Sequence, residues 1–274
     1  MCKIMAKGIV DIVIPHLNNE EFIIGLRSLR RNTPDGVINK VILIDQCDHN
    51  HTPEVLDYVD IHVVTKNLGF AKAMNTGIRL SDAKYVMCLN DDVVFFNRQW
   101  WAGIEDTFKD FPNALCVNPS SVQDPDGQGG KVVMEGYQYK EDMTDDEYAT
   151  LIKPYCIDGI CMWGPVFNRE LLDKVPGVIP GKAWFDELFF PGGGEDYDLN
   201  RRAYLSGMRC LGTNRSYVWH HWYQTRNKQG FSTVKHDGGT FEKKWTTEDG
   251  EKPDIYGHKG KKEVPMNIIR EDFE

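Results

Sequence analysis

The chain has 274 residues and a formal net charge of −9, with 41% hydrophobic and 27% charged residues. This composition suits one α/β domain with some elaboration and excludes a disordered chain. The acidic balance argues against a broad nucleic-acid-binding surface, which needs a basic footprint, although a local site can oppose the global charge.

The cysteines and the apolar runs bear on the cellular location. Seven cysteines occur without any C-x-x-C pair, which favours buried free thiols over a disulfide framework. The first residues lack an apolar core of signal-peptide length, and no run approaches the roughly 20 apolar residues that cross a bilayer. We therefore expect a cytoplasmic protein that is soluble or peripheral at a membrane surface.

The first part of the chain alternates strand-like and helix-like segments. Strands are expected at 9–14, 41–44, 62–64, 85–89 and 115–117, and helices at 19–31, 69–80 and 100–108. This alternation predicts a doubly wound, Rossmann-like, mostly parallel sheet flanked by helices.

The second part is less regular. We expect a loop at 120–130, a hairpin strand at 132–139, a solvated acidic stretch at 141–147, strands at 157–163 and 217–222, and helices at 169–175 and 195–205. A main domain is predicted over 1–235, and 236–274 is predicted to be a polar tail or lid.

Polar residues follow three of the expected strands. They are Pro15, His16, Leu17 and Asn18, then Asp45, then Asn90, Asp91 and Asp92. Ligands of open α/β sheets bind outside the carboxyl ends of the strands. These residues are therefore expected to meet at one ligand-binding edge.

The pair Asp91-Asp92 has two interpretations. Adjacent carboxylates repel each other when they are desolvated, and a divalent cation relieves that repulsion with oxygen ligands. Asn-Asp clusters after strands are also common in ordinary turns. The pair alone does not decide between a metal site and a turn.

Three further features have both a functional and a structural interpretation. Glu195-Asp196 follow three glycines and could supply a general base or simply favour a helix start. His220 or His221 could bind a metal or pack in a core. The small residues from Gly69 onward could let a ligand or a loop approach the backbone closely, or could let an amphipathic helix pack tightly.

Several segments, in this order, resemble the family-2 nucleotide-sugar glycosyltransferases of the GT-A fold. The resemblance covers about Val10 to His221. The matching segments are Val13-Ile14-Pro15-His16-Leu17-Asn18, Leu43-Ile44-Asp45, the N-x-G-x-A-x-A-x-N-x-G run from Asn67 to Gly77, Leu89-Asn90-Asp91-Asp92-Val93, Gly194-Glu195-Asp196-Tyr197-Asp198-Leu199 and Ser216-Tyr217-Val218-Trp219-His220.

The resemblance implies a nucleotide-binding half over about 8–118 and an acceptor-side half over about 119–235. Asp45 would hold the nucleobase, and Asp92 and His220 would bind Mn²⁺ or Mg²⁺. Asp91 would meet the sugar or a metal-bound water. The residues implied to contact the donor are Pro15, His16, Leu17, Asn18, Asp45, Asn67, Gly69, Phe70, Ala71, Asn75, Asn90 and Asp91.

The resemblance also implies an inverting reaction. Asp196 would act as the general base on an acceptor hydroxyl, and Glu195 would orient the acceptor. The donor would be a UDP-sugar, and the acceptor a glycan, a lipid-linked glycan or another hydroxyl compound. Candidates for stacking on a sugar ring are Trp163, Trp184, Phe185 and Trp222. Core packing is the alternative for all four, and it is the favoured interpretation for Trp163.

The sequence argues against three rival functions. A sugar-phosphate nucleotidyltransferase needs a glycine-rich and basic loop after the first strand, and Pro15 to Asn19 has neither. A dinucleotide-dependent oxidoreductase needs a G-x-G-x-x-G run, which is missing. A glycan- or partner-binding protein that lost catalysis needs no base, so Asp196 argues against it.

Overall fold

The computed structural model describes residues 8–19, 22–47, 53–122, 142–158, 162–176, 184–221, 240–241 and 243–246, together with the backbone of 263–265. The strand predicted at 132–139, Trp222 and most of the predicted tail lie outside these residues.

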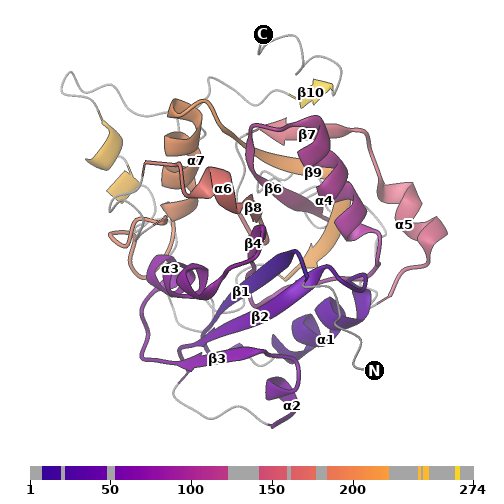
Figure 1. The fold of residues 1–274 in the computed structure, drawn as a ribbon, viewed down its shortest axis with the longest axis horizontal. Coiled ribbons are helices and arrows are strands. Elements are labelled where there is room, and N and C mark those ends of the chain that lie inside the picture. Colours follow the sequence, from indigo (N-terminus) through magenta and orange to yellow (C-terminus); the bar gives the residue numbers. More distant parts are fainter. Residues whose placement is uncertain are drawn as a thin grey trace, which may run out of the picture.

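The first part of the chain has the predicted alternation (Figure 1). Its strands are β1 (Val10–His16), β2 (Ile38–Asp45), β3 (Ile61–Val64), β4 (Tyr85–Cys88), β5 (Val93–Val94) and β6 (Ala114–Ser121). Its helices are α1 (Phe22–Asn32), α2 (Pro53–Leu56), α3 (Phe70–Leu80) and α4 (Trp100–Asp110).

The second part adds further strands and helices. The strands are β7 (Tyr155–Asp158), β8 (Val166–Asn168), β9 (Arg209–His220) and β10 (Glu263–Pro265). The helices are α5 (Asp145–Leu151), α6 (Arg169–Leu172) and α7 (Glu195–Leu205).

The strands form one continuous sheet in the order β10-β7-β9-β6-β8-β4-β1-β2-β3. Strands β3, β2, β1 and β4 run parallel to one another, and β6 runs parallel to β9. Strand β8 lies antiparallel between β4 and β6, and β7 lies antiparallel to β9. The predicted α/β fold class is confirmed, with antiparallel strands confined to pairings that involve the second part.

Helices cover both faces of the sheet, and each face has its own core. Along β1, Ile12 and Ile14 belong to the core beneath α1, α4 and α5. Val13 points to the other core, beneath α3, α6 and α7. Figure 1 shows these two groups of helices on opposite sides of the sheet. The alternation follows from the two-residue period of a strand, and it explains why the whole of β1 is apolar or buried.

Helix α3 packs against β1 through Gly77. A Cβ added at Gly77 would lie 2.1 Å from Val13 Cγ1. The side chain of Val13 is completely buried and has little room to turn away. The last glycine of the N-x-G-x-A-x-A-x-N-x-G run therefore sets the distance between this helix and the sheet.

The stretch predicted as solvated and acidic is mostly exposed where the structure describes it, but it also opens helix α5, which was not predicted. Thr144 and Glu147 form a reciprocal capping box there, and Tyr148, just beyond the stretch, is buried. The start predicted for the loop at 120–130 is wrong. Ser120 and Ser121 belong to β6 instead of the predicted loop. Periodicity missed α5 because it has barely two turns, and missed β8 because it has three residues.

The described cysteines are free and buried, as predicted. They are Cys47, Cys88, Cys116, Cys156 and Cys210. Burial raises the pKa of Cys47 to about 12, so its thiol stays protonated near neutrality. Among the described residues, no helix is both long enough and apolar enough to span a bilayer.

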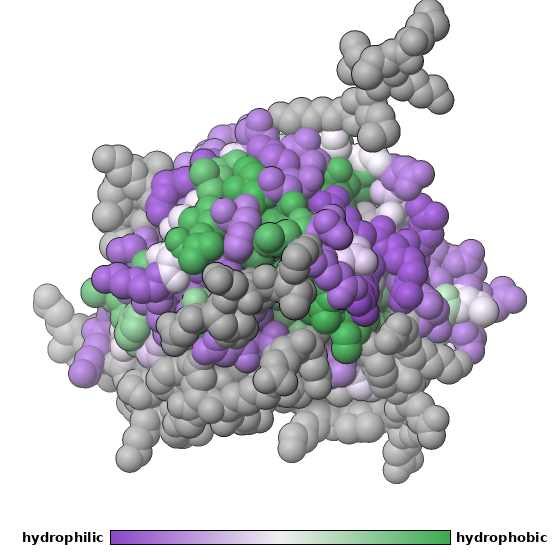
Figure 2. All heavy atoms as spheres, turned by 90° about the horizontal axis from the view of Figure 1, so that it is seen from below, coloured by the Kyte–Doolittle hydropathy of each residue, from purple (hydrophilic) through white to green (hydrophobic). Residues whose placement is uncertain are grey.

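Hydrophobic residues also reach the surface. The most exposed large apolar side chains in the described part are Leu188 (71%), Val64 (67%) and Leu205 (62%). Figure 2 shows hydrophobic residues gathered in one area of the face seen from below, bordered by hydrophilic ones.

Replacing Gly77 with alanine should lower the free energy of unfolding by about 1–3 kcal/mol, because the added methyl overpacks the contact with Val13. Urea denaturation measures the change. Thr76→Ala, one residue away and partly exposed, is the control and should stay within about 0.5 kcal/mol of the wild type. A Gly77→Ala protein as stable as the wild type would contradict this packing.

Candidate functional site

Strands β1, β2 and β4 end at the same edge of the sheet, as the polar residues that follow these strands predict. His16 lies opposite Asp45 in the parallel pairing of β1 with β2, and Gln46 N donates to His16 O at 2.9 Å. On the other side of β1, Leu89 N donates to Val13 O at 2.9 Å. The loop after β4 is thereby placed beside the loop after β1.

Asp91 joins these two loops. Its Oδ2 lies 2.8 Å from His16 Nδ1 and accepts from Leu17 N at 3.4 Å. Its backbone oxygen accepts from Asn19 Nδ2 at 2.9 Å. Burial raises the pKa of Asp91 above the usual carboxyl range, against the opposing pull of His16. In this structure Asp91 holds the two loops together.

Asp92 lies against His220. The antiparallel pairing of β5 with β9 sets Val93 opposite His220, and His221 N donates to Asp92 O at 2.8 Å. As a result Asp92 Oδ1 lies 3.1 Å from His220 Nε2, with both side chains more than nine-tenths buried. The structure therefore brings together the two residues predicted as metal ligands, which are 128 positions apart in the sequence.

The surroundings of Asp92 suit a hard cation. Apart from its ion pair with His220, Asp92 Oδ1 is buried and accepts no hydrogen bond, and Asn90 Oδ1 is also buried without a partner. Asn90 lies next to the same imidazole, with its Nδ2 3.4 Å from His220 Nε2. Carboxylate and amide oxygens together with an imidazole are ligands that Mn²⁺ or Mg²⁺ accepts. Within the described ranges, no cluster of three or more His, Cys, Asp or Glu side chains could hold a metal ion. Such a cation would take its remaining ligands from water or substrate phosphates.

Trp163 packs on the same histidine. Its ring stacks on His220 with centroids 5.5 Å apart and an interplanar angle of 25°, and it is almost fully buried. Trp184 and Phe185 are buried as well. These three rings form core contacts in the structure, so their predicted stacking on a sugar stays a prediction.

Asp45 is buried and has partners on both oxygens. Oδ1 accepts from Cys47 N at 3.0 Å, and Oδ2 lies 2.8 Å from His62 Nε2. Nearby, Asn18 adopts a positive φ of 55° and donates its backbone N–H to Cys47 Sγ at 3.1 Å. The contact of Asp45 with a nucleobase remains a prediction, and the contact with His62 was not anticipated.

The start of α3 is occupied by the loop of residues 184–194, which we call the acceptor loop. Asn67 Oδ1 accepts from Gly69 N at 2.9 Å, and Phe70 N donates to Pro191 O at 2.8 Å. A Cβ added at Gly69, which has φ 75°, would lie 2.7 Å from Phe190 Cδ2. The glycine thus admits the acceptor loop, one of the two close approaches that its small size predicted.

Asn75 fastens the same loop from the middle of α3. Its fully buried amide accepts from Trp184 N at 3.1 Å and Phe185 N at 3.0 Å, and donates to Phe185 O at 2.8 Å. Ala71, also predicted to contact the donor, is buried in the core beneath α3. Donor contacts of Asn75 and Ala71 stay predictions, since the structure shows both in internal contacts.

Glu195 and Asp196 open α7, and the preceding Gly194 has φ 87°. Glu195 is buried, and its Oε2 accepts from Gly193 N. Asp196 is partly exposed, and its Oδ1 accepts from Tyr197 N at 2.9 Å. The two carboxylates therefore differ: Glu195 shapes the glycine turn, whereas Asp196 keeps contact with solvent.

Two residues of this region were not among the site residues predicted from the sequence. Phe190 is 59% exposed and lies over Gly69, so an exposed aromatic ring stands beside the start of α3. Lys244 forms ion pairs with Asp186 and Asp198. A lone aromatic in a loop and a lysine in a polar tail give no periodic signal, so neither could be found from pattern.

Comparison with known proteins gives one family match. The family described as glycosyl transferase family 2 matches residues 11–175, more than half of the chain. A search of curated proteins found no match.

Several solved structures share the fold. The mannosyltransferase PcManGT from Pyrobaculum calidifontis, in complex with GDP-Man and Mn²⁺, has a TM-score of 0.57 and 17% identity over 92% of this chain. GalNAc-T7 with UDP, GalNAc and Mn²⁺ has a TM-score of 0.53 and 18% identity over 77%. S. aureus TarS 1-349 has a TM-score of 0.52 and 14% identity over 77%. The matches span 67%, 42% and 60% of those chains.

Replacing Asn75 with alanine should lower the free energy of unfolding by about 2–5 kcal/mol, because two buried N–H groups and one buried carbonyl of the acceptor loop lose their partner. Urea denaturation beside the Thr76→Ala control measures the loss. A change below about 0.5 kcal/mol would mean that the amide does not hold this loop.

Proposed function

This chain belongs to glycosyl transferase family 2 and has the GT-A fold, and we propose that it moves a sugar from a nucleotide-diphosphate donor to an acceptor hydroxyl with inversion. The observation that carries the proposal is the contact between Asp92 and His220 at the edge where β1, β2 and β4 end. That edge is where open α/β sheets bind their ligands.

The proposed metal site uses Asp92 and His220, with Asn90 Oδ1 beside them. A buried carboxylate oxygen and a buried amide oxygen without hydrogen-bond partners support it. When bound there, Mn²⁺ or Mg²⁺ would neutralise charge on the diphosphate leaving group. Two of the similar structures contain Mn²⁺ with GDP-Man or UDP, which supports a divalent cation and a nucleotide-sugar donor.

In the proposed reaction Asp196 takes the proton of the acceptor hydroxyl. The hydroxyl oxygen forms a bond to the anomeric carbon, the bond from that carbon to the phosphate oxygen breaks, and the nucleoside diphosphate leaves with the bonding electrons. Attack opposite the leaving group inverts the anomeric centre. The partial exposure of Asp196 in the first turn of α7 supports this role, because a base must reach a substrate proton.

The remaining elements of the proposal concern substrates and location. We take a UDP-sugar as the donor, and a glycan, a lipid-linked glycan or another hydroxyl compound as the acceptor. Asp45, Asn18 and Phe70 lie around the edge that would receive the nucleotide. The buried free thiols support the predicted cytoplasmic location, since such thiols persist in reducing compartments.

Asp92→Asn should abolish the stabilisation that Mn²⁺ confers together with a nucleotide-sugar. Wild-type protein should gain about 2.7 kcal/mol at a hundredfold excess of ligand over its Kd, and the variant close to none. A thermal-shift screen of UDP- and GDP-sugars, with and without Mn²⁺, measures both and identifies the donor. Asp82→Asn, an exposed carboxylate at the opposite end of β4, is the control. Equal Mn²⁺-dependent shifts in both variants would place the metal elsewhere.

Asp196→Asn should reduce transfer by about 100- to 10,000-fold, the usual contribution of a general base, while donor and Mn²⁺ still stabilise the protein. Transfer is followed by release of the nucleoside diphosphate with the donor that the screen selects. Asp146→Asn, on the exposed start of α5, should transfer at the wild-type rate. Wild-type turnover by the Asp196 variant would remove it as the base, and absence of turnover in the wild type would favour a glycan-binding protein.

A further inference from the structure

Two carboxylates of the acceptor side are buried together. Asp186 belongs to the acceptor loop and Asp198 to the first turn of α7, and their exposed fractions are 1% and 0%. Buried carboxylates repel each other and lose hydration, so each requires a cation or several hydrogen-bond donors. The cations and donors that satisfy Asp186 and Asp198 therefore link the segments from which they come to the acceptor loop and to α7.

Arg202 satisfies only one of the two. Its Nε donates to Asp198 Oδ2 at 2.8 Å, one turn earlier on α7. Its terminal nitrogens donate to Pro176 O at 2.9 Å and Trp184 O at 2.6 Å. Asp186 accepts from Leu188 N at 3.0 Å, which is a contact within the acceptor loop. Arg202 therefore leaves the charge of Asp186 without a cation.

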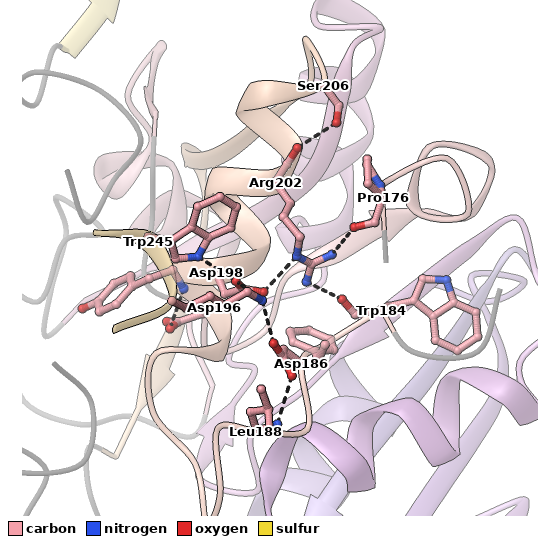
Figure 3. Close-up of polar contacts among 12 residues, drawn as sticks. Pro176, Trp184, Asp186, Leu188, Asp196, Asp198, Arg202, Ser206 and Trp245 are labelled. Carbon is pink, nitrogen blue, oxygen red and sulfur yellow. Dashed lines mark hydrogen bonds and ion pairs between the residues drawn. The ribbon is translucent and has the colours of Figure 1, made fainter. Parts of the chain in front are cut away.

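The missing cation comes from the C-terminal part of the chain. Lys244 Nζ lies 2.6 Å from Asp186 Oδ2 and 2.7 Å from Asp198 Oδ1. Across the described ranges, Lys244 is the one cation at ion-pair distance from Asp186. Trp245 Nε1 donates to Asp198 Oδ1 at 2.8 Å. Figure 3 shows Asp186, Asp198 and Trp245 close together, with Arg202 on the far side of Asp198.

The same segment packs along α7. The ring of Phe241 is almost fully buried and meets Tyr197 edge-on, with centroids 6.2 Å apart. The guanidinium of Arg201 lies over the Trp245 ring, 5.1 Å from its centroid. Contacts thus fall on residues 197, 198 and 201 of α7, immediately after Asp196.

We propose that residues 240–241 and 243–246 are a positioning element of the acceptor side, in which Lys244 and Trp245 tether the acceptor loop to the start of α7 and so fix the orientation of Asp196. The inference rests on the proposed function, because it assigns Asp196 the base role argued above. Lys244 and Trp245 touch no reacting atom here, and both act through Asp186 and Asp198.

Removal of the ammonium group should loosen this region specifically. Asp186 would remain buried without a cation, and the two carboxylates could relieve their repulsion only by moving apart or by taking up a proton. Asp196 lies two residues before Asp198 on the same turn, so a shift of that turn changes the direction of the base. A displacement of about 1 Å at a reacting group can cost about 100-fold in rate.

The test compares Lys244→Met with Lys243→Met, which removes the neighbouring, exposed lysine. Hydrogen exchange of peptides covering 184–199 should be faster in Lys244→Met and unchanged in Lys243→Met. Transfer by Lys244→Met should fall by about 10- to 100-fold, whereas its stabilisation by donor and Mn²⁺ should match the wild type. Lys244→Arg, whose guanidinium can also reach two carboxylates, should recover both protection and transfer.

Wild-type exchange protection and wild-type transfer in Lys244→Met would overturn the proposal, as would loss of transfer with no change in exchange at 184–199. If Lys244→Met does not fold, Trp245→Phe keeps an aromatic side chain but removes the indole N–H that donates to Asp198, and should show the same two effects in weaker form. The exchange measurement needs no substrate. An inactive wild type would therefore sink the proposed function while still reporting whether the tether exists.

Discussion

Burial of negative charge at the carboxyl edge of the sheet is the constraint on which the site depends. The pairing of β5 with β9 removes Asp92 from water and places one imidazole, that of His220, beside it. Burial of a carboxylate oxygen in that position costs free energy unless a cation binds it. Asp91, the adjacent carboxylate, already has His16 and a backbone N–H as partners. The two neighbouring aspartates therefore have different surroundings: Asp91 ties two loops together, and Asp92 is the proposed metal ligand.

Helix α3 connects the edge proposed to bind the donor with the loop proposed to face the acceptor. Gly77 lets the helix pack closely against β1, and Asn75 holds the acceptor loop through hydrogen bonds. In the first turn of the helix, Phe70 N donates a hydrogen bond to Pro191 O. Two residues of the N-x-G-x-A-x-A-x-N-x-G run therefore have structural roles: Gly77 permits close packing on β1, and Asn75 holds the acceptor loop. Through these contacts the acceptor loop is fixed relative to the strands that would receive the donor, which a transfer between two bound substrates requires.

Much of the first half could be predicted because its strands are continuously apolar and its helices amphipathic, as in β1 and α3. The alternation of strands and helices predicted a parallel sheet. Its carboxyl edge brings His16, Asp45 and Asp91 together, as expected. The sequence could not reveal contacts that only the tertiary fold creates. No local pattern states that Asn75 turns toward a loop 110 residues away, or that Lys244 enters a buried pair of carboxylates. Short elements such as β8 also fall below the length at which periodicity is visible.

The central claim is that this edge binds a divalent cation between Asp92 and His220 for transfer from a nucleotide-sugar. The most direct measurement is the anomalous X-ray signal of Mn²⁺ in crystals grown with UDP. The account predicts a peak within about 2.0–2.3 Å of an Asp92 carboxylate oxygen and a His220 ring nitrogen, with diphosphate oxygens completing the shell. Bound UDP with no peak there, or a peak at another set of side chains, would contradict it.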